Sequence, residues 1–166
     1  MNVAFLCLGG NMGDRLVNLN HTKALISEER LTILAESSIY ETKAWGDENA
    51  PDYLNQCIKI ATDLDAASLM QLLLTIEQKM GRMRNGTNAD RTADIDILLF
   101  NDEIINTGFL TVPHPRLHLR QFVLKPLNEI AAEIVHPVLN KTIHELLESC
   151  TDKLTVRKIG TNVHLY

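Results

Sequence analysis

Short apolar runs alternate with longer amphipathic stretches along the first 100 residues of the chain. The runs are rich in β-branched and aromatic residues, which is typical of strands, whereas apolar positions three or four residues apart indicate helices. Strands are therefore predicted at residues 2–8, 31–42, 52–64 and 94–100. Helices are predicted at residues 16–29 and 65–80. Turns and loops are predicted where polar residues and glycine gather, at residues 9–15, 43–51 and 81–91.

The rest of the chain has shorter elements. The segment "NDEIINT" predicts a hairpin into a short edge strand, and residues 110–131 mix loop and helix. A short helix is predicted at residues 140–149, and a last strand in the tail "KLTVRKI". The order strand, helix, strand, strand, helix, strand matches the β-α-β-β-α-β ferredoxin-like pattern. We therefore expect an α+β protein with a single domain over residues 1–166, whose C-terminal elements cover the second face of the sheet.

Composition narrows the functional classes. The 166 residues are 45% hydrophobic, enough for the core of one domain, and the formal net charge is −5, from 21 acidic residues against 16 Lys and Arg. This balance disfavours a general nucleic-acid-binding protein, which carries a broad basic surface. No apolar run approaches the roughly 20 residues that cross a bilayer, and the first residues lack the pattern of a signal peptide. Three cysteines without C-x-x-C spacing indicate reduced, buried thiols in a cytoplasmic protein.

Asp94 and Asp96 are the strongest local sign of chemistry. They lie in the apolar stretch "RTADIDILLF", and because side chains on a strand alternate between faces, both carboxylates point the same way. Two such carboxylates are costly to bury unless positive charge lies between them. Mg²⁺ prefers carboxylate oxygens and takes substrate phosphates in its remaining positions. Arg82, Arg84 and Arg91 in the preceding loop suit a polyphosphate, although a solvated acidic face or a direct Arg91–Asp94 ion pair is the simpler alternative.

Other positions allow both a structural and a functional interpretation. His114 lies between two prolines in "TVPHPR", which would hold its imidazole in place, although alone such a histidine is more often a surface loop residue. Tyr53 and Asn55 share a strand face and suit a flat heterocycle, although a strand start with a capping Asn is the simpler explanation. Taken by itself, Phe122 is expected to be a residue of the hydrophobic core. The spacing of "GGNMGDR" fits no phosphate-binding loop and indicates a tight turn.

Taken together, these stretches resemble the folate-pathway enzyme family 6-hydroxymethyl-7,8-dihydropterin pyrophosphokinase. The resemblance runs from Val3 to about Pro137, with its motifs in the family's order. The motifs are "LGGNMGDR", "SSIYET", "PDYLN", "IEQKMGRMR", "RTADIDILLF", "LTVPHPR", "RQFVLKPLNEIAAE" and "HP". The combination of an arginine-rich loop, a D-x-D strand and a downstream T-V-P-H is highly specific.

The resemblance implies a three-layer α-β-α domain on a ferredoxin-like core, acting as a monomer. It implies transfer of the β,γ-pyrophosphate of ATP to the hydroxymethyl group of the pterin, which gives AMP. Two Mg²⁺ ions, held by Asp94 and Asp96, would bridge the ATP phosphates and supply the missing positive charge. Arg82 and Arg91 would meet the phosphates from the loop before the strand.

The other site residues that the resemblance implies fall into an ATP side and a pterin side. Those on the ATP side are Glu77, Arg84, Leu98, Thr111, His114 and Arg120, of which the histidine would contact phosphate. Those on the pterin side are Tyr53, Asn55 and Phe122, with the backbone of Thr42, Lys43, Ala44 and Trp45 at the edge of the ring. A reduced pterin is flat and amide-like, so amide hydrogen bonds and aromatic stacking would select it. The loops at 43–51 and 81–91 would exclude water.

The chain departs from the family pattern at three places. The loop at 81–91 has no tryptophan, where some members use one to seal the pterin, and Trp45 is the only tryptophan of the chain. Phe109 stands where some members have an arginine, and Gly10 replaces the usual serine of the opening motif. These departures bear on affinity and loop closure and leave the expected reaction type unchanged.

Two other functions stay open at this point. The first is another Mg²⁺-dependent phosphoryl or nucleotidyl transferase on a ferredoxin-like core, because the D-x-D pair alone suits both. The "PDYLN" motif and the acidic net charge favour a pterin over a nucleic-acid template. The second is a non-catalytic module that binds a pterin or a nucleotide. This function is disfavoured because the chain keeps Asp94, Asp96, Arg82, Arg91 and His114.

Overall fold

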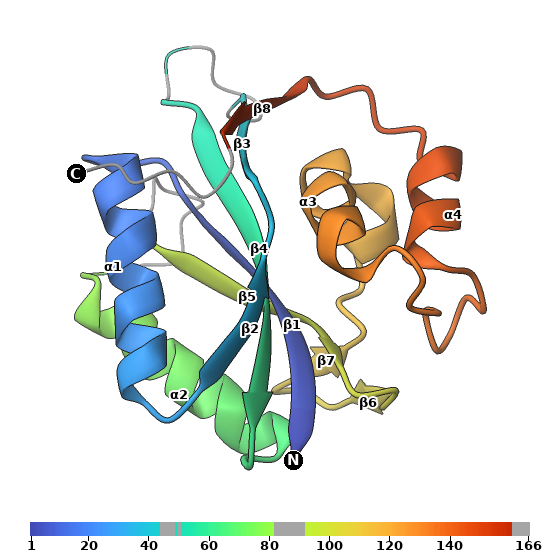
Figure 1. The fold of residues 1–166 in the computed structure, drawn as a ribbon, viewed down its shortest axis with the longest axis horizontal. Helices are drawn as coiled ribbons and strands as arrows, with labels where there is room; N and C mark the ends of the chain where they lie inside the picture. Colours follow the sequence, from blue (N-terminus) through green and yellow to red (C-terminus); the bar gives the residue numbers. More distant parts are fainter. Residues whose placement is uncertain (44–48, 50, 82–91, 161–166) are drawn as a thin grey trace.

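In a computed structural model, which describes residues 1–43, 49, 51–81 and 92–160, helices cover both faces of an antiparallel sheet of six strands (Figure 1). The strand order is β5-β1-β4-β3-β8, and β2 pairs with β4 as well. The strands of this sheet are β1 (Asn2–Gly10), β2 (Thr32–Glu36), β3 (Ile39–Thr42), β4 (Tyr53–Thr62), β5 (Asp94–Phe100) and β8 (Val156–Gly160). The prediction of a mixed α+β protein is confirmed.

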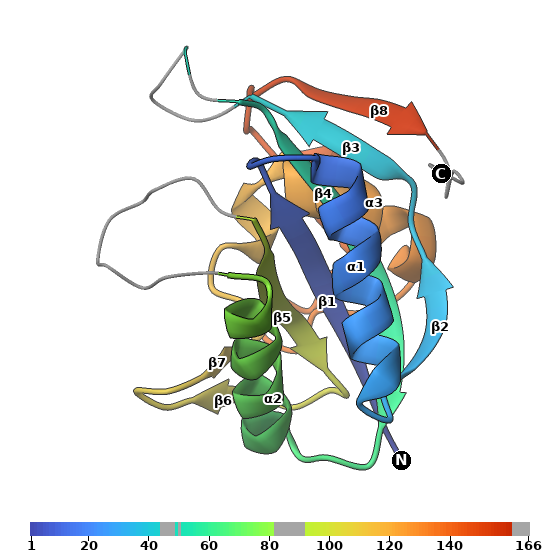
Figure 2. The same ribbon diagram turned by 90° about the vertical axis from the view of Figure 1, so that its left-hand side faces the viewer.

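The four helices of the described residues form two layers. Figure 1 and Figure 2 show α1 (Arg15–Glu28) and α2 (Ala66–Lys79) on one face of the sheet, and α3 (Gln121–Ala131) and α4 (Ile143–Ser149) on the other. A short 3-10 helix, η1 (Leu117–Leu119), precedes α3. The first, second and fourth helices start at side chains that accept a backbone N–H of the first turn, namely Asp14, Asp65 and Thr142. Such caps satisfy N–H groups that the helix itself leaves without acceptors.

Alternation along the strands divides the core into two clusters. On β1, Leu6 and Leu8 are fully buried toward α1 and α2, whereas Phe5 and Cys7 are buried toward α3 and α4. A strand with helices on both faces buries both sets of side chains, so β1 is apolar almost throughout. Cys7 and Cys57 are buried as predicted, but Cys150 is only half-buried.

The segment 31–42 was predicted to be one strand, and this is wrong. Ser37 and Ser38 separate β2 from β3. The Ser37 hydroxyl accepts the Cys57 N–H at 2.9 Å and donates to the Ser38 carbonyl at 2.7 Å, while the Ser38 N–H donates to Glu129 on α3 at 2.8 Å. Serine side chains that bond to nearby backbone compete with a regular strand ladder, which accounts for the break.

Two further expectations need correction. The turn predicted from Gly9 begins later, because β1 continues through Gly10 and stays paired with Leu54 of β4. The hairpin after residue 100 adds no edge strand to the main sheet. Its strands, β6 (Ile105–Asn106) and β7 (Thr111–Val112), form a separate two-stranded sheet. Within the described part of the chain, no helix combines the length and apolarity needed to cross a membrane.

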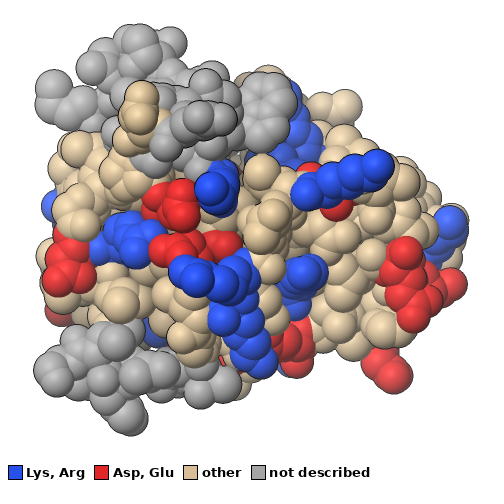
Figure 3. Space-filling view, turned by 90° about the horizontal axis from the view of Figure 1, so that it is seen from above, with Lys and Arg blue, Asp and Glu red and all other residues tan. Residues whose placement is uncertain are grey.

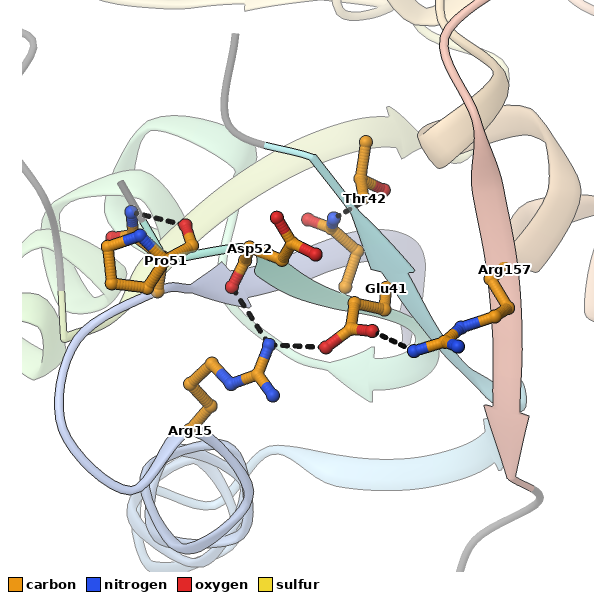
Figure 4. A network of polar contacts seen from close by, with 8 residues as sticks. Arg15, Glu41, Thr42, Pro51, Asp52 and Arg157 are labelled. Carbon is orange, nitrogen blue, oxygen red and sulfur yellow. Dashed lines mark hydrogen bonds and ion pairs between the residues drawn. The ribbon is translucent and has the colours of Figure 1, made fainter. Parts of the chain in front are cut away.

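A half-buried glutamate links β3 and its neighbour β8 to α1. Glu41 on β3 accepts a hydrogen bond from Arg15 at 2.6 Å and another from Arg157 on β8 (Figure 4). Arg15 also donates to the carbonyl of Asp52 at 3.0 Å, just before β4. The Glu41 side chain is 12% exposed, so its charge is well shielded from water. These contacts fix the sheet edge that carries Thr42, where β3 ends.

The network makes stability depend on pH. The hydrogen bond from Arg15, followed by that from Arg157, lowers the pKa of Glu41 below its ordinary value of 4.5. The native state therefore holds this carboxylate in its charged form, and its stabilising contribution is present above pH 4.5 and lost as pH falls through the lower folded pKa. Glu41→Gln is expected to reduce the free energy of unfolding by about 1–2 kcal/mol at pH 7. This difference should be smaller in urea titrations near pH 3, below the ordinary pKa of 4.5.

Glu133→Gln is the matched control, because Glu133 is an exposed glutamate beyond the end of α3. It should unfold like wild type at both pH values. A destabilisation by Glu41→Gln that is equally large at pH 7 and pH 3 would contradict the charge-based account.

Candidate active site

The site begins at Gly9, where three neighbouring strands are in register. Gly9 lies opposite Asn55 of β4 on one side and opposite Asp94 of β5 on the other. A Cβ atom at this position would lie 2.7 Å from the Asn55 side-chain oxygen and 3.2 Å from the Leu54 carbonyl oxygen. The missing side chain therefore lets the Asn55 amide lie close against β1. The Asn55 amide and the Asp94 carboxylate are thus separated by a single residue of β1, Gly9.

A cavity of about 490 Å³ opens at this end of the sheet. This volume is in the range of small-molecule sites. The residues that line it come from β1, the ends of β3, β4 and β5, the segment around η1, the start of α3, and the segment after α4. They are Cys7, Gly9, Thr42, Lys43, Tyr53, Asn55, Asp94, Asp96, Arg116, Leu119, Arg120, Phe122, Asp152 and Leu154. The structure therefore brings eight of the predicted site residues together: both aspartates, one arginine and five pterin-side residues.

The acidic pair lies on one wall of this cavity. Asp94 and Asp96 project from the same face of β5, and the Asp96 side chain is 41% exposed. The N–H of Ile95, between them, donates to a carboxylate oxygen of Glu77 at 2.7 Å. Glu77 is 3% exposed and does not line the cavity. This predicted ATP-side residue therefore fixes the backbone that carries both aspartates.

The acidic pair fits a hard cation. Carboxylate oxygens that open onto a cavity are ligands of the kind that Mg²⁺ prefers. Among the described residues, no group of three or more His, Cys, Asp or Glu side chains could enclose a metal ion. A cation at Asp94 and Asp96 would thus keep positions for water or substrate oxygens, as Mg²⁺ does in phosphate-binding sites.

His114 stands next to the acidic pair as a neutral hydrogen-bond donor. Its backbone N–H donates to the Leu98 carbonyl at 2.9 Å, which docks the loop on β5. The Arg116 N–H donates to His114 Nδ1 at 3.1 Å, so the ring proton is on Nε2, which lies 4.0 Å from a carboxylate oxygen of Asp96. Burial, followed by the charges of Arg120 and Arg116, lowers the pKa of His114 below its ordinary value. The imidazole is therefore uncharged at pH 7.

The wall opposite the sheet combines an aromatic ring and a cation, and the sheet itself adds an oriented amide. The Arg120 guanidinium lies 5.3 Å from the centre of the Phe122 ring, a cation–π contact at the start of α3. Asn55 is 6% exposed, and its amide NH₂ donates to the Thr42 hydroxyl at 3.4 Å. Seen from above the view of Figure 1, acidic and basic side chains lie next to one another in the middle of the molecule (Figure 3).

Some predicted residues are placed elsewhere. Leu98 is buried in the core and Thr111 is exposed on β7, and neither lines the cavity. Ala44, Trp45, Arg82, Arg84 and Arg91 lie outside the described residues.

Six lining residues were not among the predicted site residues: Cys7, Gly9, Arg116, Leu119, Asp152 and Leu154. Arg116 could have been found, because it ends the "TVPHPR" motif that contains His114. Asp152 and Leu154 carry no local signal, because only the folded chain brings the C-terminal segment to the cavity.

The sequence profile of the family described as 7,8-dihydro-6-hydroxymethylpterin-pyrophosphokinase (HPPK) matches residues 5–132. The chain belongs to the HPPK family. It is 44% identical over 134 residues to the 2-amino-4-hydroxy-6-hydroxymethyldihydropteridine pyrophosphokinase of Bacillus subtilis, which covers 80% of each chain. It is 40% identical over 146 residues to the enzyme of the same name from Aquifex aeolicus, with 87% of this chain and 90% of that protein covered.

Solved structures agree on the fold. A crystal structure of Plasmodium falciparum HPPK-DHPS with pteroate matches 89% of this chain with a TM-score of 0.71 at 22% identity. The match covers 42% of that chain, so this protein spans about two fifths of its length. This likeness concerns the fold, and the family assignment rests on the sequence relatives.

The contact at Gly9 yields a prediction. Gly9→Ala places a methyl group against the Asn55 amide and the Leu54 carbonyl, and is expected to lower the free energy of unfolding by about 1–3 kcal/mol. Gly108→Ala is the matched control, because a Cβ at Gly108 would meet no atom within 4 Å. Urea titrations give the free energy of unfolding of both variants. Equal stability of the two variants would show that β1 does not hold the Asn55 amide at close contact.

Proposed function

We propose that this chain catalyses the HPPK reaction, the transfer of the β,γ-pyrophosphoryl group of ATP to 6-hydroxymethyl-7,8-dihydropterin, which gives AMP and the pterin diphosphate. One observation carries the proposal. A single cavity contains an acidic pair suited to a phosphate-bound cation and, one strand away across Gly9, an amide suited to a heterocycle. The proposal includes a ferredoxin-like core in a three-layer α-β-α sandwich, supported by the strand order and the helices on both faces. It further includes a single cytoplasmic, monomeric domain over residues 1–166.

The pterin subsite is proposed on the side of β3, β4 and α3. Asn55 would present both an amide donor and an amide acceptor to the flat ring, and the Phe122 face would stack on it. Thr42 orients the amide through its hydroxyl. The edge of the ring would lie against Tyr53 and Lys43, which line the same cavity. The proposal extends this edge to Ala44 and Trp45.

The ATP subsite is proposed on the side of β5. The Nε2–H of His114 would donate to a phosphate oxygen, and Arg120 would bring positive charge from the start of α3. Arg82 and Arg91 are proposed to meet the phosphates during the reaction. The other residues proposed on this side are Glu77, Arg84, Leu98 and Thr111. The lining arginine Arg116 adds a further cation.

Asp94 and Asp96 are proposed to hold two Mg²⁺ ions. When bound, Mg²⁺ would neutralise phosphate charge and polarise the transferred group. The chain's own contribution is to hold both substrates in one cavity with the pterin hydroxyl facing the β-phosphorus. In that arrangement, the hydroxyl oxygen bonds to the β-phosphorus as the bond to the α,β-bridging oxygen breaks. The hydroxyl proton leaves to solvent, AMP departs, and no covalent enzyme intermediate is needed.

Product analysis tests the proposal. Incubation with ATP, Mg²⁺ and 6-hydroxymethyl-7,8-dihydropterin should yield AMP, and omission of the pterin or addition of excess EDTA should abolish it. Asp96→Ala is expected to lower the rate at least about 1,000-fold, because the positive charge on the phosphates loses its anchor. Asp102→Ala, which changes an exposed aspartate after β5, is the control and should keep wild-type activity.

Other outcomes separate the alternatives. ADP instead of AMP would mean phosphoryl transfer, and tight pterin binding without any nucleotide turnover would mean a binding module. Undiminished turnover by Asp96→Ala would contradict the proposed role of the acidic pair.

A further inference from the structure

The segment after α4 reaches the cavity, although it lies beyond residues 5–132, which the HPPK family profile matches. Asp152 and Leu154 both line the cavity and are both half-buried. The segment then continues into β8, which pairs with β3 so that Val156 lies opposite Thr42. The side of the cavity that contains Thr42 is the proposed pterin subsite. The C-terminal segment therefore borders that subsite.

Asp152 caps the N-terminus of α3 from outside the helix. The residue at the N-cap position, Arg120, makes no side-chain capping hydrogen bond. The N–H of Gln121, the first residue of α3, donates instead to a carboxylate oxygen of Asp152 at 3.0 Å. The other carboxylate oxygen accepts the Leu154 N–H at 3.0 Å. A carboxylate at a helix N-terminus satisfies free N–H groups and is favoured by the helix dipole.

This cap lies within the site. Gln121 separates Arg120 from Phe122, the cation and the ring of the proposed substrate-binding wall. A shift of the first turn of α3 would move both of these side chains. The same carboxylate also holds Leu154 against the cavity, because one of its oxygens accepts the Leu154 N–H.

A second contact fixes the segment beyond Leu154. Arg157 of β8 donates to Glu41, which also accepts from Arg15 at the start of α1 (Figure 4). The segment is therefore held on both sides of Leu154, at Asp152 and at Arg157. A wall fixed at two points keeps its shape when the substrate is absent, which favours a pre-formed subsite.

We propose that the C-terminal segment 152–160 completes the pterin subsite, with Asp152 as a positioning residue for Arg120 and Phe122 and Leu154 as an apolar wall. This inference rests on the proposed function and deepens it. Asp152 acts on the substrate through the helix start that it caps, not through the reacting atoms.

Steady-state kinetics of AMP formation by the full chain test the inference. Asp152→Ala is expected to raise the KM for the pterin and lower kcat/KM about 10- to 100-fold, because misplaced binding groups are costly. Asp152→Asn should recover part of the activity lost in Asp152→Ala, because its amide oxygen can still accept the Gln121 N–H, whereas its NH₂ group cannot accept the Leu154 N–H. Leu154→Ala should raise the pterin KM about fivefold and leave the ATP KM unchanged.

The matched control is Asp65→Ala. Asp65 caps α2 through the Ser68 N–H at 2.8 Å, away from the cavity, so this variant loses a cap of the same chemistry. It should lower the melting temperature as Asp152→Ala does but keep the wild-type pterin KM. If Asp152→Ala does not fold, Leu154→Ala and Asp152→Asn still decide the question.

The outcomes distinguish the two proposals. An inactive wild-type protein would overturn the proposed function itself. An active wild type, with the pterin KM of Leu154→Ala and of Asp152→Ala equal to that of Asp65→Ala, would overturn only the role of the C-terminal segment. A raised pterin KM in Asp152→Ala that Asp152→Asn does not recover would contradict the capping role.

Discussion

The register of β1 between β4 and β5 is the constraint on which the rest of the site depends. It places Gly9 between Asn55 and Asp94, so that strands about 4.8 Å apart bring an amide and a carboxylate to opposite sides of one residue. The packing of both faces of β1 against helices fixes this register, since a slip by one residue would turn every buried side chain to the other face. The fold therefore sets the separation between the two proposed subsites.

Carboxylates outside the acidic pair hold the backbone that carries the site. Glu77 accepts the N–H of Ile95, the residue between the two aspartates. Asp152 accepts the N–H of Gln121, the residue between the arginine and the phenylalanine of the opposite wall. In both cases, one carboxyl group accepts a hydrogen bond from a main-chain N–H whose two neighbouring residues contribute side chains to the cavity walls. Such contacts suit a site that must be pre-organised.

Local patterns predicted much of this arrangement. The apolar run around Asp94 and Asp96 predicted both the strand and the shared face of its carboxylates, because alternation is a property of the strand itself. The break at Ser37 could not be predicted, since its hydroxyl bonds to a residue 20 positions away. The role of Asp152 likewise depends on a contact across 31 residues, which no local pattern encodes. Sequence reasoning thus predicted both aspartates and five pterin-side residues that line the cavity but missed the segment that borders them.

The most direct test of the central claim is a crystal structure with a non-hydrolysable ATP analogue, Mg²⁺ and 6-hydroxymethyl-7,8-dihydropterin. The account predicts the pterin ring between Asn55 and Phe122, with metal density at Asp94 and Asp96 in the same cavity. The hydroxymethyl group should then face the β-phosphorus across Gly9. Pterin density outside this cavity, or metal bound away from the two aspartates, would contradict the account.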